Sequence, residues 1–365
     1  MPGRSPLAPL HTASGASWTR VDGWEVPWAW TTPLQEAEGA RQGVALWDRA
    51  PWGRLLATGR DALDLLHRLS TNRLDDLPIG KGRTTVLTTG KGRCVDWIWV
   101  FRLPRGVLLL TGPDADGEVA SWVETYTILE DVALTSLMET TTLIGVVGPR
   151  GEDLLKGVVG LPEGMGVGEA WEGSWGDSPL LALRTDALAL PQWDLLMPAQ
   201  EAPTLWDALR QRGAAPMGEG AVEVLRIAAG VPRRGKEITP AYNPLEAGLW
   251  ESISFTKGCY IGQEVLARLK TYGRIQKALV RLTLEEPAPE GSGLWAEGRR
   301  VGTVTSCAVD VRGPVALGYL ARPFLEVGRQ VEARGPEGRA IPAWVVWAPS
   351  LPPVYQPPQE FEEES

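Results

Sequence analysis

Two spacings of hydrophobic residues alternate along most of the chain, one typical of helices and one typical of strands. Apolar residues that recur every three or four positions predict amphipathic helices. These helical segments are 61–69, 116–129, a segment that begins at 151, 203–212, 218–229 and 264–269. Short runs rich in branched and aromatic residues predict strands between them. These runs are 84–87, 95–103, 107–110, 143–147, 180–185 and 193–197.

The pattern changes at residue 277, after which helical spacing is no longer seen. Short strand patterns separated by Gly and Pro turns follow instead. They cover 277–284, 302–306, 315–320, 330–332 and 341–347. Short strands at this spacing predict a small β-barrel or sandwich. The predicted fold class is therefore α+β, with several domains and a β domain at the C-terminus.

Composition marks the two ends of the chain and suggests where its domains lie. Residues 1–17 are rich in Pro, Ser, Ala and Gly, and residues 349–365 are rich in Pro and Glu, so we expect both to be disordered. Between them we expect one α+β domain over 18–135 and a second over 136–272. A C-terminal β-barrel is expected over 273–348.

Charge and composition exclude several classes of function. The 36 basic and 45 acidic residues give a net charge of −9, which argues against a general phosphate-binding surface and direct nucleic-acid binding. Two histidines and three cysteines that lie far apart in the sequence argue against a resident metal site. Unpaired thiols suit a reducing compartment, and we see neither a signal peptide nor an apolar run that could span a membrane. We therefore expect a cytoplasmic protein without a membrane partner.

Asp96 interrupts an otherwise apolar strand that follows the turn at 90–93. Because side chains alternate along a strand, Asp96 shares a face with Cys94, Ile98 and Val100. If that face is buried, the carboxylate needs a partner or a ligand, or its pKa rises. If the face is exposed, Asp96 is the polar side of a half-buried strand. The sequence leaves both possibilities open.

The densest cluster of candidate chemistry is the segment KGCYIGQE around Cys259. Two glycines allow tight turns on either side of the thiol, and a predicted helix begins just after it. The helix N-terminus and Lys257 both favour a thiolate, whereas Glu264 opposes it. The alternative is a buried structural cysteine, since free cysteine is among the most buried residue types. The segment comprises Lys257, Gly258, Cys259, Tyr260, Ile261, Gly262, Gln263 and Glu264.

The segment 230–237, GVPRRGKE, nearly matches the phosphate-binding loop GxxxxGK[ST]. Glu237 stands where a hydroxyl residue would hold magnesium, and Pro232 removes a main-chain donor from the cradle. A nucleotide site is therefore not expected at this loop.

Taken together, these segments closely resemble the YgfZ family of folate-binding proteins. The resemblance is carried by LRIAAGVPRRGKEIT from Leu225, PLEAGL from Pro244 and FTKGCYIGQE from Phe255. The YgfZ proteins belong to the same superfamily as the glycine cleavage T protein, an aminomethyltransferase. The resemblance implies a ring of three domains around a central folate channel, with the C-terminal β-barrel as the third.

The resemblance also implies roles for individual residues. Asp96 matches the first aspartate of the T-protein GGxxDD strand, which contacts the nitrogen region of folate. Arg226 matches an arginine that could pair with a folate carboxylate. Leu190 stands where the T-protein RTGYTGEDG stretch has the glutamate that holds the pterin, and a leucine cannot make that charge-assisted pair. In the KGCYIGQE loop, we expect Lys257 to tune the thiolate, and Gln263 and Glu264 to orient the loop.

The function implied by the YgfZ resemblance is assembly or repair of iron–sulfur clusters in client enzymes, with Cys259 as the key thiol. Tetrahydrofolate or a one-carbon derivative is the implied cofactor, and Cys259 could also hold a transient iron–sulfur species. The implied partners are folate and iron–sulfur client or assembly proteins, any effect on tRNA modification is indirect, and we expect a monomer. The alternative is a folate-dependent aminomethyltransferase, another one-carbon transferase or a demethylase, in which Asp96 assists at a folate nitrogen. A third possibility is a scaffold that no longer binds folate.

Overall fold

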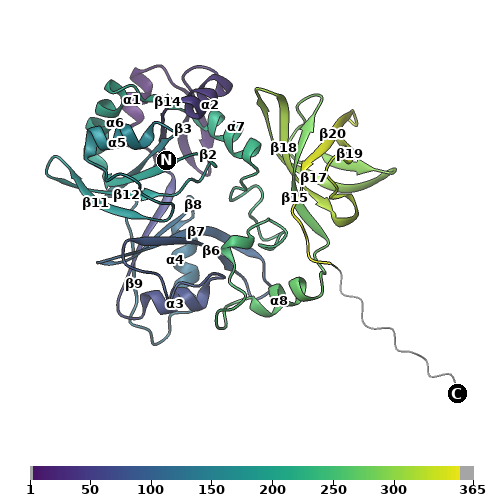
Figure 1. Ribbon diagram of the computed structural model, residues 1–365, viewed down its shortest axis with the longest axis horizontal. Helices are drawn as coiled ribbons and strands as arrows, with labels where there is room; N and C mark the ends of the chain where they lie inside the picture. Colours follow the sequence, from purple (N-terminus) through teal and green to yellow (C-terminus); the bar gives the residue numbers. More distant parts are fainter. Residues whose placement is uncertain (1–2, 354–365) are drawn as a thin grey trace.

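The structure is a computed structural model that describes residues 3–353. Figure 1 shows two bodies built on open sheets and a third that is a barrel, arranged around helix α7 (Glu219–Ala229) and the loop that follows it. This arrangement confirms the α+β class and the C-terminal β-barrel. The predicted tail from residue 354 onward lies outside the described residues.

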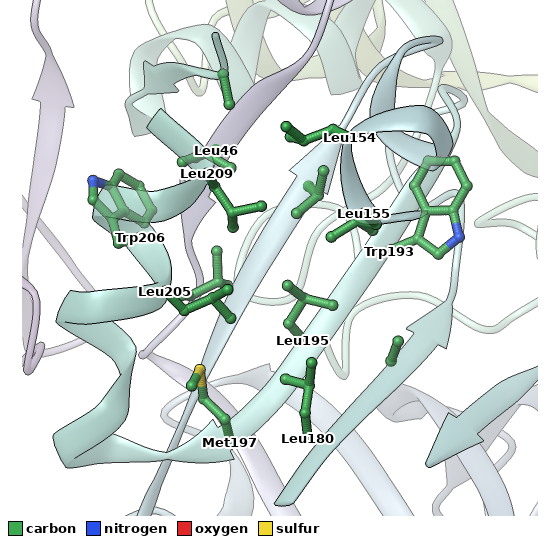
Figure 2. Packing of buried hydrophobic residues seen from close by; sticks show 14 of the residues in the cluster. Leu46, Leu154, Leu155, Leu180, Trp193, Leu195, Met197, Leu205, Trp206 and Leu209 are labelled. Atoms are coloured by element: carbon green, nitrogen blue, oxygen red, sulfur yellow. The ribbon is translucent and has the colours of Figure 1, made fainter. Parts of the chain in front are cut away.

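The first body is a six-stranded sheet with helices on both faces. Alternation along β4 shows how one strand serves both: Leu46 packs with α5 and α6, whereas Ala45 and Trp47 pack with α2 and α7. Figure 2 shows the first of these cores, where Leu205, Trp206 and Leu209 of α6 meet the sheet. The strand order is β11 (Ala170–Trp175), β12 (Ser178–Arg184), β13 (Gln192–Pro198), β10 (Thr141–Val147), β4 (Ala45–Asp48) and β14 (Ala215–Met217). The helices are α2 (Pro33–Gln42), α5 (Gly151–Val159), α6 (Ala202–Gln211) and α7.

The second body is a five-stranded antiparallel sheet with helices α3 and α4 packed on one face. Its order is β6 (Lys81–Thr88), β7 (Cys94–Leu103), β8 (Gly106–Pro113), β5 (Trp52–Thr58) and β9 (Ala133–Ser136). The helices are α3 (Ala62–Leu69), α4 (Asp116–Thr125) and, from the later chain, α8 (Gln263–Thr271). Helix α8 begins beside the turn between β6 and β7, where Gly92 lies close to Val265.

The third body is a closed six-stranded barrel with its own apolar core. Its order is β15 (Lys277–Leu284), β18 (Gly313–Ala321), β17 (Arg299–Asp310), β16 (Gly293–Ala296), β19 (Gln330–Arg334) and β20 (Ala340–Trp347). None of the helices within residues 3–353 is long and apolar enough to cross a membrane.

The two open sheets divide the chain differently from the ranges 18–135 and 136–272 that we expected. Strand β4 pairs with β10, although the whole five-stranded sheet lies between them in the sequence. The segment 52–136 is therefore an insertion within the first body. Local hydrophobic spacing contains no information about such long-range pairing, which is why the sequence did not predict it.

The N-terminal segment is ordered over its described residues, 3–17, contrary to the disorder we expected for 1–17. It forms β1 (Gly3–Arg4), which joins a small sheet with β2 (Ser17–Val21) and β3 (Trp24–Ala29), and helix α1 (Ala8–Ala13). Its small and turn-forming residues suggested disorder, but two larger side chains anchor it. Leu7 is fully buried in the core of the first body, and His11 is fully buried against Asp48.

We predict that His11→Ala lowers the free energy of unfolding by about 3 kcal/mol, because it leaves the Asp48 carboxylate buried without its imidazole partner. The His11 Nε2 to Asp48 Oδ2 distance is 2.9 Å, and both side chains are almost fully buried. Urea denaturation followed by tryptophan fluorescence measures the change. Ser14→Ala, at the exposed end of the same helix, serves as the control. Equal midpoints for both variants would contradict the anchoring role of this segment.

Candidate functional site

Asp96 lies on β7 with its side chain on a buried face, which decides the question that the sequence left open. Its carboxyl group is 1% exposed. Oδ1 accepts a hydrogen bond from the main-chain N–H of Trp97 and Oδ2 accepts one from Gly112, both at 2.8 Å. Burial raises the pKa of Asp96 to about 6, although both hydrogen bonds and the charge of Arg234 oppose the rise. This carboxyl group therefore changes its charge just below neutral pH.

A cavity of about 110 Å³ opens beside Asp96, bounded by both open sheets, α7 and the loop after it. Its apolar walls include four indole rings, which suit a flat ring system. Trp47 and Trp52 meet edge to face at 4.5 Å between ring centroids. Trp97 and Trp99 reach the cavity from β7.

Three arginines bring positive charge to this apolar cavity. Arg49 lies over the rings of Trp47 and Trp52 at 4.7 and 4.8 Å. Arg233 and Arg234 come from the loop after α7. Each arginine keeps one buried N–H without a partner among the described residues, namely Arg49 Nε, Arg233 Nη2 and Arg234 Nε. Because buried polar groups are normally hydrogen-bonded, these donors suit a ligand that presents acceptor atoms.

A second, larger cavity, the outer cavity, is lined by the same two loop arginines. Its volume is about 630 Å³, and it lies between the β2–β3 hairpin, α7 and strand β17 of the barrel. Arg233 and Arg234 line both cavities. The two cavities are therefore adjacent, and the side chains of Arg233 and Arg234 lie where they adjoin.

Arg226 differs from the folate-pairing residue that we expected. It also reaches the inner cavity, but its guanidinium is already saturated by Glu223 at 2.5 and 2.6 Å, Glu237 at 3.1 Å and Ser306 at 2.7 Å. Although burial opposes the charged form, the two glutamates raise the pKa of Arg226. The sequence could not reveal this, because two of the three partners lie outside the helix that carries the arginine. Arg226 is a structural residue.

Asp194, on β13, is a charged site residue that the sequence analysis missed. It is fully buried and forms an ion pair with Arg49 of the inner cavity. It also accepts hydrogen bonds from Thr185 at 2.7 Å and from Gln192 at 2.8 Å. The signal that could have found it is the one that identified Asp96, a single acidic residue inside an apolar strand.

Leu190, which replaces the expected glutamate, lies beside the inner cavity rather than in it. It lines a separate cavity of about 530 Å³ between α7 and the barrel. Leu188, two residues earlier, reaches the inner cavity instead. The RTDALALPQ stretch therefore reaches the inner cavity with the apolar residues Ala187 and Leu188.

Cys259 is exposed at the surface, whereas Cys94 is buried and Cys307 is half-buried. Cys259 is not among the residues that line the inner or the outer cavity. Helix α8 starts at Gln263, one residue before the predicted start at 264, and Gly262 precedes it with φ at +83°. A Cβ at Gly262 would lie 2.7 Å from the carbonyl oxygen of Thr89, so glycine is required there, whereas Gly258 faces open space.

Lys257 differs from the thiolate-tuning residue that we expected. Its ammonium is buried under the end of α3 and donates to the main-chain carbonyls of His67, of Ser70 at 2.6 Å and of Asn72 at 2.8 Å. Burial lowers its pKa to about 8. Lys257 therefore fixes the loop to α3, and the Tyr260 ring lies 5.1 Å from the ammonium.

Glu264 also differs from the loop-orienting residue that we expected. Glu264 is exposed and pairs with Arg268 along α8, with 2.6 Å between Oε1 and Nη2. Gln263 is the first residue of the same helix. The ion pair of Glu264 does not include the Cys259 thiol. Within residues 3–353, no group of three or more potential metal ligands is found.

Comparisons with known proteins agree with this architecture. The GCVT N-terminal domain family matches residues 7–257, and the glycine cleavage T-protein C-terminal barrel domain matches residues 277–351. A chloroplastic putative transferase of Arabidopsis thaliana is 31% identical over 297 residues, which is 79% of this chain and 68% of the relative. An aminomethyltransferase of Symbiobacterium thermophilum is 30% identical over 363 residues, or 95% of this chain and 96% of the relative.

A solved structure shares the fold over almost the whole chain. The glycine cleavage system aminomethyltransferase T from Bartonella henselae has a TM-score of 0.87 at 22% identity and covers 95% of this chain and 97% of its own. The sheets, the barrel and the cavity between them define a T-protein-like α+β fold. The chain belongs to the family of the glycine cleavage T proteins, the aminomethyltransferases.

We predict that ionisation of Asp96 lowers the free energy of unfolding as the pH rises from about 4 to about 6. The folded state keeps the proton to about pH 6, whereas the unfolded state loses it near pH 4. Ionising the buried group therefore costs about 2–3 kcal/mol over this range. Urea denaturation of the wild type and Asp96→Asn across pH 4–7 measures this component, which the variant should lack. Parallel pH profiles would contradict the assignment.

We also predict a single fast-reacting thiol in the native protein. Burial raises the pKa of both Cys94 and Cys307, whereas Cys259 is exposed. A chromogenic disulfide reagent at pH 8 should modify one thiol about tenfold faster than the other two. Cys259→Ser should remove the fast phase, and Cys307→Ser should leave it unchanged. A fast phase that survives in Cys259→Ser would contradict the exposure of this thiol.

Proposed function

We propose that this protein holds a reduced folate in the cavity beside Asp96 and acts through Cys259 in assembly or repair of iron–sulfur clusters in client enzymes. The separation of the cavity beside Asp96 from the exposed Cys259 thiol is the main support for this proposal. The cavity lies between the sheets and offers donors and indole walls, whereas the thiol is exposed on a fixed loop outside it. The YgfZ-like segment KGCYIGQE supports the thiol-based role.

The residues around the inner cavity fit a reduced folate. Its pterin carries a planar pyrimidinone ring with oxygen and nitrogen acceptors, which suits indole walls and the unpaired donors of Arg49, Arg233 and Arg234. The outer cavity gives room for the benzoyl-glutamate part. When bound, tetrahydrofolate supplies nitrogens that carry one-carbon units. Asp96 would lie against that nitrogen region, as in the T-protein pattern.

A folate-dependent one-carbon transferase is the second candidate, and one observation favours it. Asp96 is buried with a pKa raised to about 6, so it can hold or release a proton near neutral pH. The missing carboxylate at Leu190 and the exposed cysteine loop favour the first candidate. Under either proposal we place the protein in the cytoplasm as a monomer, without direct contact to nucleic acid or membranes.

The test combines ligand binding with a cellular readout. Anaerobic titration with tetrahydrofolate, followed by tryptophan fluorescence and calorimetry, should show saturable binding that Asp96→Asn weakens and Cys259→Ser leaves unchanged. In cells that lack this protein, the activity of an iron–sulfur enzyme should then be restored by the wild type and Cys307→Ser but not by Cys259→Ser.

The same variants distinguish the two candidates. Restoration by Asp96→Asn together with failure of Cys259→Ser supports the thiol-based factor. The opposite result supports the transferase and contradicts the first proposal. Absence of tetrahydrofolate binding by the wild type contradicts both.

A further inference from the structure

Arg234 lies against Asp96 in a position that only a glycine on the neighbouring strand permits. A Cβ at Gly112 would lie 2.6 Å from Arg234 Cδ and 3.2 Å from Asp96 Oδ1. The side chain of Arg234 is thereby held between β8 and the loop after α7. Its outer end pairs with Glu118 of α4, which fixes the orientation of the guanidinium.

Within residues 3–353 the Nε–H of Arg234 finds no hydrogen-bond partner, although a carboxylate lies nearby. The distance from Nε to Asp96 Oδ1 is 4.0 Å, which is too long for a hydrogen bond. Both oxygens of Asp96 already accept main-chain N–H groups, from Trp97 and Gly112. Arg234 Nε is nevertheless buried. A buried donor held in place without an acceptor is costly, so this geometry suits a ligand that brings one.

We propose that Arg234 makes the site selective for a folate whose one-carbon unit carries an oxygen, namely a formyl-tetrahydrofolate. This inference rests on the proposed folate site, in which Asp96 faces the nitrogens that carry the one-carbon unit. A substituent on such a nitrogen then lies beside the Nε–H of Arg234. A formyl oxygen accepts this hydrogen bond, whereas a methyl group of similar size leaves the donor buried and unpaired.

Calorimetry under anaerobic conditions compares 5-formyl-, 10-formyl- and 5-methyl-tetrahydrofolate with the full-length protein. We expect the wild type to bind the better of the two formyl compounds at least about tenfold more tightly than the methyl compound. Arg234→Lys keeps the positive charge but lacks the Nε–H. This variant should lose the preference because its affinity for the formyl compound falls, while its affinity for the methyl compound changes little.

Glu118→Gln is the matched control, because it removes the negative charge beside Arg234 but keeps a side-chain oxygen that can accept from the guanidinium, and it leaves the Nε–H in place. It should retain the preference for the formyl compound. Equal binding of all three compounds by the wild type would overturn the inference and leave the folate site intact. A preference that survives in Arg234→Lys would also overturn it. If none of the three compounds binds, the inference is overturned together with the folate proposal.

Discussion

A buried network of ion pairs on α7 and the loop after it is the interaction on which the rest of the structure depends. Arg233 bridges Glu219 and Glu223, and Arg226 bridges Glu223 and Glu237. Glu219 also accepts the indole N–H of a tryptophan of the first sheet, and Glu237 accepts two hydroxyls of the barrel. Because removing one partner of a buried pair leaves an uncompensated charge, the network fixes the loop between these bodies.

The position of this loop determines which side chains the inner and outer cavities present to a ligand. It carries Arg233 and Arg234 to the point where the inner and outer cavities meet, beside Asp96. The cysteine loop is fixed separately, through the ammonium of Lys257 at the end of α3. Under our proposal, ligand binding and thiol chemistry therefore belong to different surfaces of the molecule, which would let a T-protein fold serve a task other than aminomethyl transfer.

The sequence predicted features that depend on neighbouring residues and missed those that depend on distant ones. Helix α8 and the barrel follow from local spacing and turn residues, and both are present. Asp96 was identified as an anomaly in a strand, but its burial depends on what covers the sheet. Lys257 and Arg226 contact main-chain carbonyls and acidic side chains that folding brings close. The sequence does not reveal these partners, so it led us to assign the two residues to a thiol and a ligand. Asp194 shows the same anomaly as Asp96 and was overlooked.

The central claim is that folate binds between the sheets and that Cys259 stays outside that site. A crystal structure of the full chain with 5-formyl-tetrahydrofolate tests it most directly. We expect the pterin to lie in the cavity bounded by Trp97, Asp96 and Arg234. The benzoyl-glutamate part should lie in the outer cavity, and the folate should not contact Cys259. Folate bound elsewhere on the chain, or in contact with Cys259, would contradict it.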